Sequence, residues 1–352
     1  MLRAAASRAA SLRHLRTVTS VLGRAGRDPP AASAPRTPHP TPLPPHRRPR
    51  HAAALSDDES TAPLAKTSAR LGSRVGFLGA GAMGEALLRG LLDSGCLAPA
   101  DVSASVRTES RKVAIKSLGV DAVHGDALTG GAAAVAAASD VIIVAVKPAA
   151  FPAVLDALAP SIDVGRHLVV SIAAGITTAA MERRLPPGAR VVRVMPNTPS
   201  LVGAGASVFA LGAAATPDDE AVVARLLASV GLALPVDERL VDAATGLSGC
   251  GPAYVLLAIE ALADGGVREG LPREAAIALA AHTVAGAARM VTDLPEGGRV
   301  PRHPALLREA VCSPGGATIV GLAELEDAGV RGALARAVGA AARRARELAG
   351  DE

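Results

Sequence analysis

The chain has 352 residues, of which 49% are hydrophobic, and its aromatic side chains are limited to one tyrosine and three phenylalanines. This length is sufficient for two domains, whose cores must be built mainly from alanine, valine, leucine and isoleucine. The formal net charge of +4 comes from residues 1–70, which hold twelve Lys and Arg and four Asp and Glu. Residues 71–352 hold 25 Lys and Arg and 29 Asp and Glu. This part of the chain therefore lacks the basic bias that nucleic-acid binding requires.

Residues 1–70 have the composition of a targeting leader followed by a linker. Six arginines and no acidic residue occur in the first 27 positions, and four apolar residues recur there at helical spacing: Leu12, Leu15, Val18 and Leu22. A basic, amphipathic segment predicts an organelle transit peptide; the regular arginine spacing favours the mitochondrion, with the plastid or the cytoplasm as alternatives. Nine prolines in residues 28–50 predict an extended, disordered linker.

Strand-like apolar runs alternate with helix-like stretches between residues 71 and 236. The five strand-like runs are 74–78, 101–107, 140–148, 167–175 and 189–199. Regular alternation predicts a parallel sheet with right-handed helical crossovers, because parallel strands need a helix to connect them. We therefore expect an α/β fold with a Rossmann-type nucleotide-binding domain over residues 71–236.

A glycine-rich turn follows the first of these strands. Residues 79–84 match the GxGxxG pattern and open a helix over residues 82–92, which is the context that a dinucleotide-binding motif requires. Gly79 is expected to make the turn, Gly81 to admit the pyrophosphate and Gly84 to allow close packing of helix on strand. The six predicted cofactor-binding residues of this motif are Gly79, Ala80, Gly81, Ala82, Met83 and Gly84.

The end of the second strand indicates which dinucleotide is bound. Sites for NAD end this strand with Asp or Glu, whereas here Ser105 and Arg107 occupy it, with Arg111 one helical turn further on. A hydroxyl and two guanidinium groups suit a 2′-phosphate, so NADPH is the predicted cofactor, with NADH as a weaker one. The alternative is that Arg107 and Arg111 are solvated surface charges.

The ends of three later strands should lie at the same edge of the sheet, where ligands of such folds bind. The residues expected to contact the cofactor there are Val146, Lys147, Pro148, Ala173 and Asn197. Asn197 suits either a hydrogen bond to the nicotinamide ribose or an ordering role in its own loop. An electrostatic or structural role is expected for Lys147 rather than that of a base.

Residues 237–352 contain only helical periodicity. The five helix-like stretches are 252–266, 272–291, 303–311, 317–329 and 331–350. Their apolar positions are abundant and small, which predicts an all-helical second domain that packs against another copy of the chain. The three cysteines are widely spaced and form no CxxC pair, so neither a disulfide framework nor a metal site is expected. No uninterrupted apolar run of 18–20 residues occurs, which predicts no membrane span.

One loop near the C-terminus has the composition of an anion site. Ser313-Pro314-Gly315-Gly316-Ala317-Thr318 offers backbone N–H groups and two hydroxyls with little side-chain bulk at the start of a helix. Such a loop suits a small substrate with a carboxylate. A threonine hydroxyl is not a strong base at neutral pH, which fits a reduction in which the substrate already carries its proton.

The segments RVGFLGAGAMGEALLRG, VAVKP, VMPNTP and CSPGGATIVGLAELEDAGVRG together resemble the pyrroline-5-carboxylate reductases over residues 74–350. This resemblance implies reduction of 1-pyrroline-5-carboxylate to L-proline by NADPH or NADH, the last step of proline biosynthesis, in a homodimer that often assembles into decamers. It also implies that the substrate-binding residues are Ser313, Gly315, Gly316, Ala317 and Thr318, with Thr318 catalytic beside the ring nitrogen. Cys250 departs from the serine that is usual in the family, and residues 294–302 lengthen a turn before the loop.

Two other functions compete with this prediction. A dehydrogenase of the β-hydroxyacid type needs a catalytic lysine in its helical domain, and the chain has no lysine after Lys147. A non-catalytic, NADPH-binding or redox-sensing protein has no use for the intact loop at residues 313–318. His303 precedes a proline and is expected to start a helix rather than to act as an acid or base. Tyr254 is expected to pack at an interface.

Overall fold

The computed structural model describes residues 71–292 and 303–350, all of which belong to one unit spanning residues 59–352. The predicted leader and linker (1–70) and the whole of the long turn at 294–302 lie outside the described residues.

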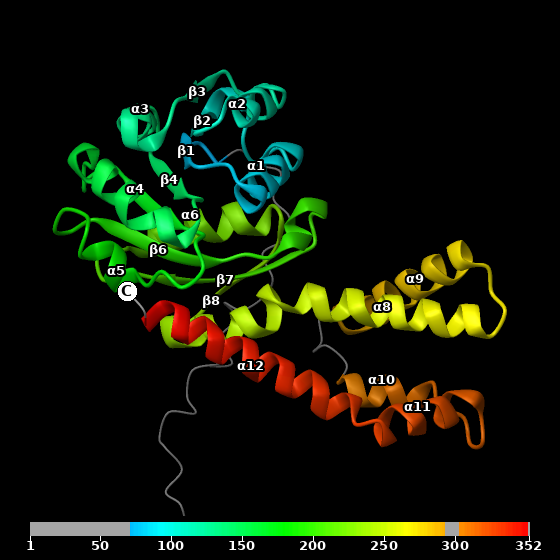
Figure 1. Ribbon diagram of the computed structural model, residues 1–352. Coiled ribbons are helices and arrows are strands. Elements are labelled where there is room, and N and C mark those ends of the chain that lie inside the picture. The colour runs from blue at the N-terminus through cyan, green and yellow to red at the C-terminus, as the bar shows by residue number, and fades with distance from the viewer. Residues whose placement is uncertain (1–70, 293–302, 351–352) are drawn as a thin grey trace, which may run out of the picture. The chain divides into compact units, whose positions relative to one another are not determined.

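The first part of the fold is an eight-stranded sheet (Figure 1). Its strands are β1 (Val75–Leu78), β2 (Val102–Ser105), β3 (Ala122–His124), β4 (Val141–Val144), β5 (Leu168–Ser171), β6 (Arg190–Met195), β7 (Gly205–Leu211) and β8 (Gly231–Pro235). Their order is β3-β2-β1-β4-β5-β6-β7-β8, and the pairs from β3 through to β6 are all parallel. This arrangement confirms the Rossmann-type fold and the five predicted strands.

Helices cover both faces of this sheet. They are α1 (Ala82–Asp93), α2 (Glu109–Lys116), α3 (Gly131–Ala138), α4 (Phe151–Leu158), α5 (Thr178–Glu182) and α6 (Pro217–Ala228). Alternate residues of one strand enter two separate cores: Phe77 packs in the cluster that includes Leu88 of α1, whereas Leu78 packs in the cluster that includes Leu155 of α4. Burial on both faces explains why the central strands are continuous apolar runs.

Three strands were missing from the sequence interpretation. β3 has only three residues, and β7 and β8 extend the sheet beyond the last predicted strand. The five predicted strands are all parallel, as expected, and β7, which was not predicted, pairs antiparallel to β6. The reason is the connection: only the 3₁₀ turn η6 (Thr198–Val202) and a few flanking residues join β6 to β7, whereas a parallel crossover needs a dozen residues or more.

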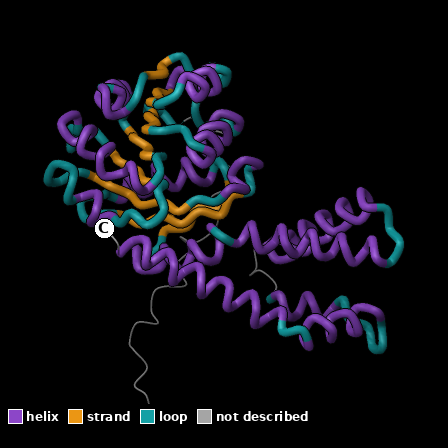
Figure 2. Tube along the Cα trace, in the orientation of Figure 1, coloured by secondary structure: helices purple, strands orange, loops and turns teal. Residues whose placement is uncertain are grey.

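The described residues after Pro235 contain helices and no strand, as predicted (Figure 2). A short stretch, η7 (Glu238–Leu240), α7 (Val241–Ala244) and the π-helical turn η8 (Thr245–Gly249), leads into the long helices. These are α8 (Gly251–Arg268), α9 (Arg273–Thr292), α10 (Pro304–Ala310), α11 (Ala317–Asp327) and α12 (Val330–Gly350). Small residues allow close approach, because a Cβ on Gly246 would lie 2.5 Å from the carbonyl oxygen of Val338 in α12.

The long helices leave much apolar surface uncovered in the single chain. Ala263, Ala276 and Ala280 bury the contact between α8 and α9, yet Leu256 and Leu257 are 64% and 67% exposed. Two stretches, 238–268 and 273–292, are long and apolar enough to cross a membrane by length and composition. Only 11% of each qualifying window is buried, so burial inside the chain does not account for these apolar residues. The absence of a membrane span therefore stays a prediction, and a second protein surface is the other natural cover for these leucines.

Buried polar contacts join the sheet to the first helices of the C-terminal part. The guanidinium of Arg193 on β6, only 4% exposed, lies 2.7 Å from Asp242 and 3.6 Å from Glu238. Glu238 in turn accepts hydrogen bonds of 2.7 Å and 2.6 Å from the backbone N–H and the hydroxyl of Thr178. We call Arg193, Asp242, Glu238 and Thr178 the joint.

Candidate functional site

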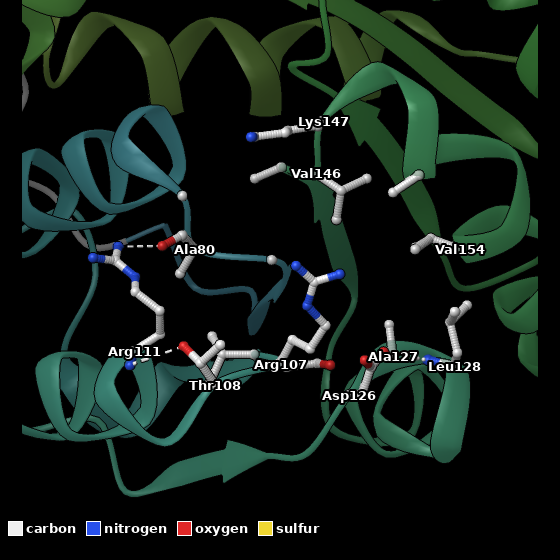
Figure 3. Close-up of a pocket in the computed structure, with 16 residues that line it drawn as sticks. Ala80, Arg107, Thr108, Arg111, Asp126, Ala127, Leu128, Val146, Lys147 and Val154 are labelled. Atoms are coloured by element: carbon white, nitrogen blue, oxygen red, sulfur yellow. Dashed lines mark hydrogen bonds between the residues drawn. The ribbon is translucent and has the colours of Figure 1, made fainter.

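A cavity of about 310 Å³ lies where β1, β2 and β4 end (Figure 3). The residues that line it come from the glycine-rich turn, the end of β2, the segment after β3 and the end of β4. They are Gly79, Ala80, Gly81, Ser105, Val106, Arg107, Thr108, Arg111, Asp126, Ala127, Leu128, Ala145, Val146, Lys147, Ala150 and Val154. The carboxyl edge of the parallel strands is where the sequence predicted the cofactor.

The glycine-rich turn has the geometry that a bound pyrophosphate requires. Gly79 adopts φ of +83°, and a Cβ there would lie 2.9 Å from the carbonyl oxygen of Ala145, so only glycine makes this turn. A Cβ on Gly84 would lie 2.8 Å from that of Ala145, which accounts for the close packing of α1 on β4. The space beside Gly81 is open within 4 Å, and Gly81 caps α1 without a side-chain hydrogen bond. The exposed amides of α1 can therefore bind an anion.

The residues predicted to hold the 2′-phosphate differ in what they do. The Ser105 hydroxyl is buried and donates a 2.7 Å hydrogen bond to the carbonyl of Gly125, so it orders the segment after β3. Arg111 donates to the carbonyl of Ala80 and, at 2.5 Å, to the carboxylate of Glu85. Arg107 alone of the three presents an exposed guanidinium inside the pocket, as Figure 3 shows. Gly125 takes the Ser105 hydroxyl hydrogen in this structure, although Ser105 lines the pocket, so its role as a ligand of the phosphate stays a prediction.

The remaining predicted cofactor residues divide into two groups. Val146 and Lys147 line the pocket, and Lys147 is exposed. The lining does not include the others: Ala82, Met83, Gly84, Pro148, Ala173 and Asn197.

Asn197 fills the loop-ordering role that was one of its two alternatives. Its Oδ1 accepts a 2.8 Å hydrogen bond from the N–H of Ala206, and its Nδ2 donates to the carbonyl of Ser248 at 3.0 Å. This side chain is 5% exposed and ties the end of β6 both to β7 and to η8.

Several pocket residues were not predicted, and three of them follow β3. Asp126, Ala127 and Leu128 form one wall, and the Asp126 carboxylate accepts from the N–H of Leu128 at 3.0 Å. Because β3 was not recognised as a strand, the rule that ligands bind beyond strand ends was not applied there.

The loop at residues 313–318 forms a helix start, as predicted. Gly315 has φ of +66°, and Gly316 is the N-cap of α11 with no side-chain cap, which leaves the first amides of the helix free for an anion. A Cβ on Gly316 would collide with the present position of the Ser313 hydroxyl, so a larger residue here would displace that side chain. Thr318, the second residue of α11, is exposed. None of the residues that line the cofactor pocket belongs to residues 303–350.

His303 caps a helix, as expected. Its Nδ1 accepts a 3.2 Å hydrogen bond from the N–H of Ala305 at the start of α10, with Pro304 as the first helical residue. Tyr254 on α8 is half-buried, and its hydroxyl lies 3.5 Å from the carbonyl of Ala337. Neither side chain lines the cofactor pocket.

A Rossmann-type sheet with a glycine-rich anion site, followed by helices, defines a nicotinamide-dependent oxidoreductase. Comparison with protein families agrees: residues 74–175 match NADP oxidoreductase, coenzyme F420-dependent, and residues 238–348 match the pyrroline-5-carboxylate reductase dimerisation domain. Pyrroline-5-carboxylate reductase of Arabidopsis thaliana is 45% identical over 276 residues, which cover 78% of this chain and 95% of that protein. Pyrroline-5-carboxylate reductase 2 of Homo sapiens is 43% identical over 279 residues, 78% of this chain and 83% of that protein. The chain belongs to the pyrroline-5-carboxylate reductase family.

Solved structures agree with this assignment. The reductase of Coxiella burnetii has a TM-score of 0.70 at 33% identity, over 78% of this chain and 98% of that one. The Plasmodium falciparum pyrroline carboxylate reductase, solved with NADP bound, has a TM-score of 0.69 at 29% identity, over 80% of this chain and 100% of that one.

Proposed function

We propose that this protein reduces 1-pyrroline-5-carboxylate to L-proline with a reduced nicotinamide dinucleotide, the last step of proline biosynthesis. The observation that carries the proposal is the likeness to pyrroline-5-carboxylate reductases along 78% of the chain, through both the nucleotide-binding and the helical part. The second candidate from the sequence is a dehydrogenase of the β-hydroxyacid type. Such an enzyme needs a lysine in its helical domain, and this chain has no lysine after Lys147.

Each half of the reaction has its own part of the chain. When bound, the dinucleotide supplies a hydride to the imine carbon, and the electron pair of the C=N bond passes to the ring nitrogen. The uncapped amides of α11 suit the substrate carboxylate, because first-turn N–H groups have no intrahelical partner. We expect the Thr318 hydroxyl to accept a hydrogen bond from the ring nitrogen, which carries its own proton as an iminium.

The complete site is proposed to need two copies of the chain. The dimerisation domain and the exposed leucines of α8 support an oligomer. We propose that the loop at residues 313–318 meets the nicotinamide through this assembly, with the homodimer as the smallest active form. The decamer stays a prediction.

A direct assay tests the proposed function. The purified protein should oxidise NADPH only when 1-pyrroline-5-carboxylate is added, and proline should accumulate in equal amount. Binding of NADPH without any oxidation on addition of this imine would contradict the proposal and favour the non-catalytic alternative.

We propose that NADPH is the preferred cofactor and that Arg107 determines the preference. Because a charge-assisted hydrogen bond contributes about 1.5–3 kcal/mol, Arg107→Ala should raise the Michaelis constant for NADPH about tenfold or more and leave that for NADH nearly unchanged. Lys116→Ala, a nearby exposed cation of α2 outside the pocket lining, is the control. Equal losses for both cofactors with Arg107→Ala would place the 2′-phosphate elsewhere.

We also propose that residues 1–70 direct the protein to the mitochondrion. A fusion of these residues to a fluorescent reporter should enter mitochondria, and replacement of the six arginines among the first 27 residues by glutamine should abolish entry, because such leaders are read by their positive charge. A protein that starts at residue 71 should keep full activity. A reporter that stays diffuse in the cytosol, or enters plastids, would contradict the assignment.

A further inference from the structure

Arg111 connects α2 to the glycine-rich turn and to α1. It lies on α2, and its Nη2 donates both to the Ala80 carbonyl, inside the glycine-rich turn, and at 2.5 Å to the Glu85 carboxylate on α1. The turn is thereby hydrogen-bonded from outside the βα unit that forms it. In Figure 3 the Arg111 guanidinium lies against Ala80, whereas that of Arg107 lies inside the pocket.

Glu85 poses an electrostatic problem for a phosphate-binding turn. It stands in the first turn of α1, where the amides attract an anion, and its carboxylate would repel one. Two arginines neutralise it: Arg89 at 2.7 Å on one carboxylate oxygen and Arg111 on the other. These hydrogen bonds, that from Arg89 first and that from Arg111 after it, lower the pKa of Glu85 against the opposing effect of burial.

Two of the three guanidinium nitrogens of Arg111 are already committed or enclosed. Nη2 makes both of the contacts above, and Nε is buried with no hydrogen-bond partner. To turn Nη2 toward a 2′-phosphate, the guanidinium would have to abandon its contacts with both Ala80 and Glu85, at the expense of the conformation of the turn.

We propose that Arg111 is a positioning residue, which holds the glycine-rich turn in its anion-binding conformation and screens Glu85, rather than a ligand of the 2′-phosphate. Its substitution should therefore weaken NADPH and NADH alike, because both carry the pyrophosphate that the turn binds. This inference rests on the proposed cofactor site. It separates the two arginines after β2: Arg107 selects between the cofactors, and Arg111 prepares the site for either.

The experiment compares dissociation constants of NADPH and NADH for the full protein without substrate, measured by fluorescence titration of the reduced nicotinamide. Arg111→Ala should raise both constants by a similar factor, about tenfold, because a charge-assisted hydrogen bond is lost. Arg111→Lys should stay weak for both cofactors, since the lysine side chain is shorter and its strongly hydrated ammonium does not reach the position from which Nη2 contacts both Ala80 and Glu85. Arg89→Ala, which removes a partner of Glu85 that does not contact the turn, is the matched control and should change either constant less than about twofold.

Three outcomes are distinguishable. A loss with Arg111→Ala that is confined to NADPH and is restored by Arg111→Lys would make Arg111 a phosphate ligand and overturn the inference. An equal loss with Arg89→Ala would reduce Arg111 to general screening of Glu85 and overturn its positioning role. If neither Arg107→Ala nor Arg111→Ala alters the binding of either cofactor, the pocket itself is not the cofactor site, and the proposed cofactor site fails together with this inference.

Discussion

Thr318→Val is expected to lower the turnover number by roughly 10- to 1,000-fold, the range for a hydrogen bond of about 1.5–4 kcal/mol that acts at the reacting centre. Valine keeps the branched shape of threonine and removes only the hydroxyl. The side chain is exposed at the start of α11, so its loss should leave the thermal midpoint unchanged. Steady-state kinetics with 1-pyrroline-5-carboxylate measure the effect.

Two further measurements show whether the hydroxyl itself is responsible. Thr318→Ser should recover much of the lost rate because it restores the hydroxyl. The dissociation constant of NADPH should be the same in both variants, since residues 303–350 contribute nothing to the lining of the cofactor pocket. A valine enzyme with unchanged turnover and an unchanged Michaelis constant for the imine would remove Thr318 from the mechanism, and the loop would serve only as a helix start.

Arg193→Met is expected to destabilise the protein by about 3 kcal/mol, because it leaves the carboxylates of Asp242 and Glu238 without their buried cation. The value lies at the low end for a buried pair, since the Glu238 side chain is 29% exposed and water screens it in part. Methionine fills similar volume, so the loss reports charge rather than a cavity. At roughly 2–4 °C per kcal/mol for a chain of this size, the thermal midpoint should fall by several degrees at fixed protein concentration.

The matched control is Arg239→Met in the same segment. Arg239 pairs with Asp237 at 3.1 Å, but it is 74% exposed, and exposed ion pairs contribute about 0–1 kcal/mol. Its thermal midpoint should therefore stay close to that of the unmodified protein. Similar midpoints for the Arg193 and Arg239 variants would show that the joint carboxylates are solvated and that the buried pair does not hold the sheet to the helices.

The site could be predicted from sequence where local geometry dictates the residue. Gly79 has a positive φ, and Gly84 packs closely against the end of β4. Only glycine fits these positions, so the GxGxxG pattern predicts the conformation of the turn. Gly316 and Pro304 mark helix starts for equally local reasons. These constraints act over a few residues, and a single sequence therefore displays them.

What the sequence could not predict depends on contacts between distant residues. Ser105 looked like a phosphate ligand because its position after β2 is visible, whereas its partner Gly125 lies twenty residues away. Arg111 was grouped with Arg107 for the same reason, and its contacts with Ala80 and Glu85 depend on how α1 packs beside α2. The direction of β7 likewise depends on the short connection after β6, which carries no strong signal of its own.

The proposed dimer, in which a second copy covers the exposed leucines of α8, would make the folded state of this protein subject to mass action. A surface that is buried only when a second copy binds stabilises the native state in proportion to the logarithm of the free partner concentration, and it does nothing for an isolated chain. Dilution of the unmodified protein should therefore lower its melting temperature. A substitution far from the nicotinamide, such as Leu257→Glu, is expected to act as an inhibitor of assembly, with lost activity that returns at high protein concentration. The melting temperature of this protein is therefore expected to depend on protein concentration as well as on sequence.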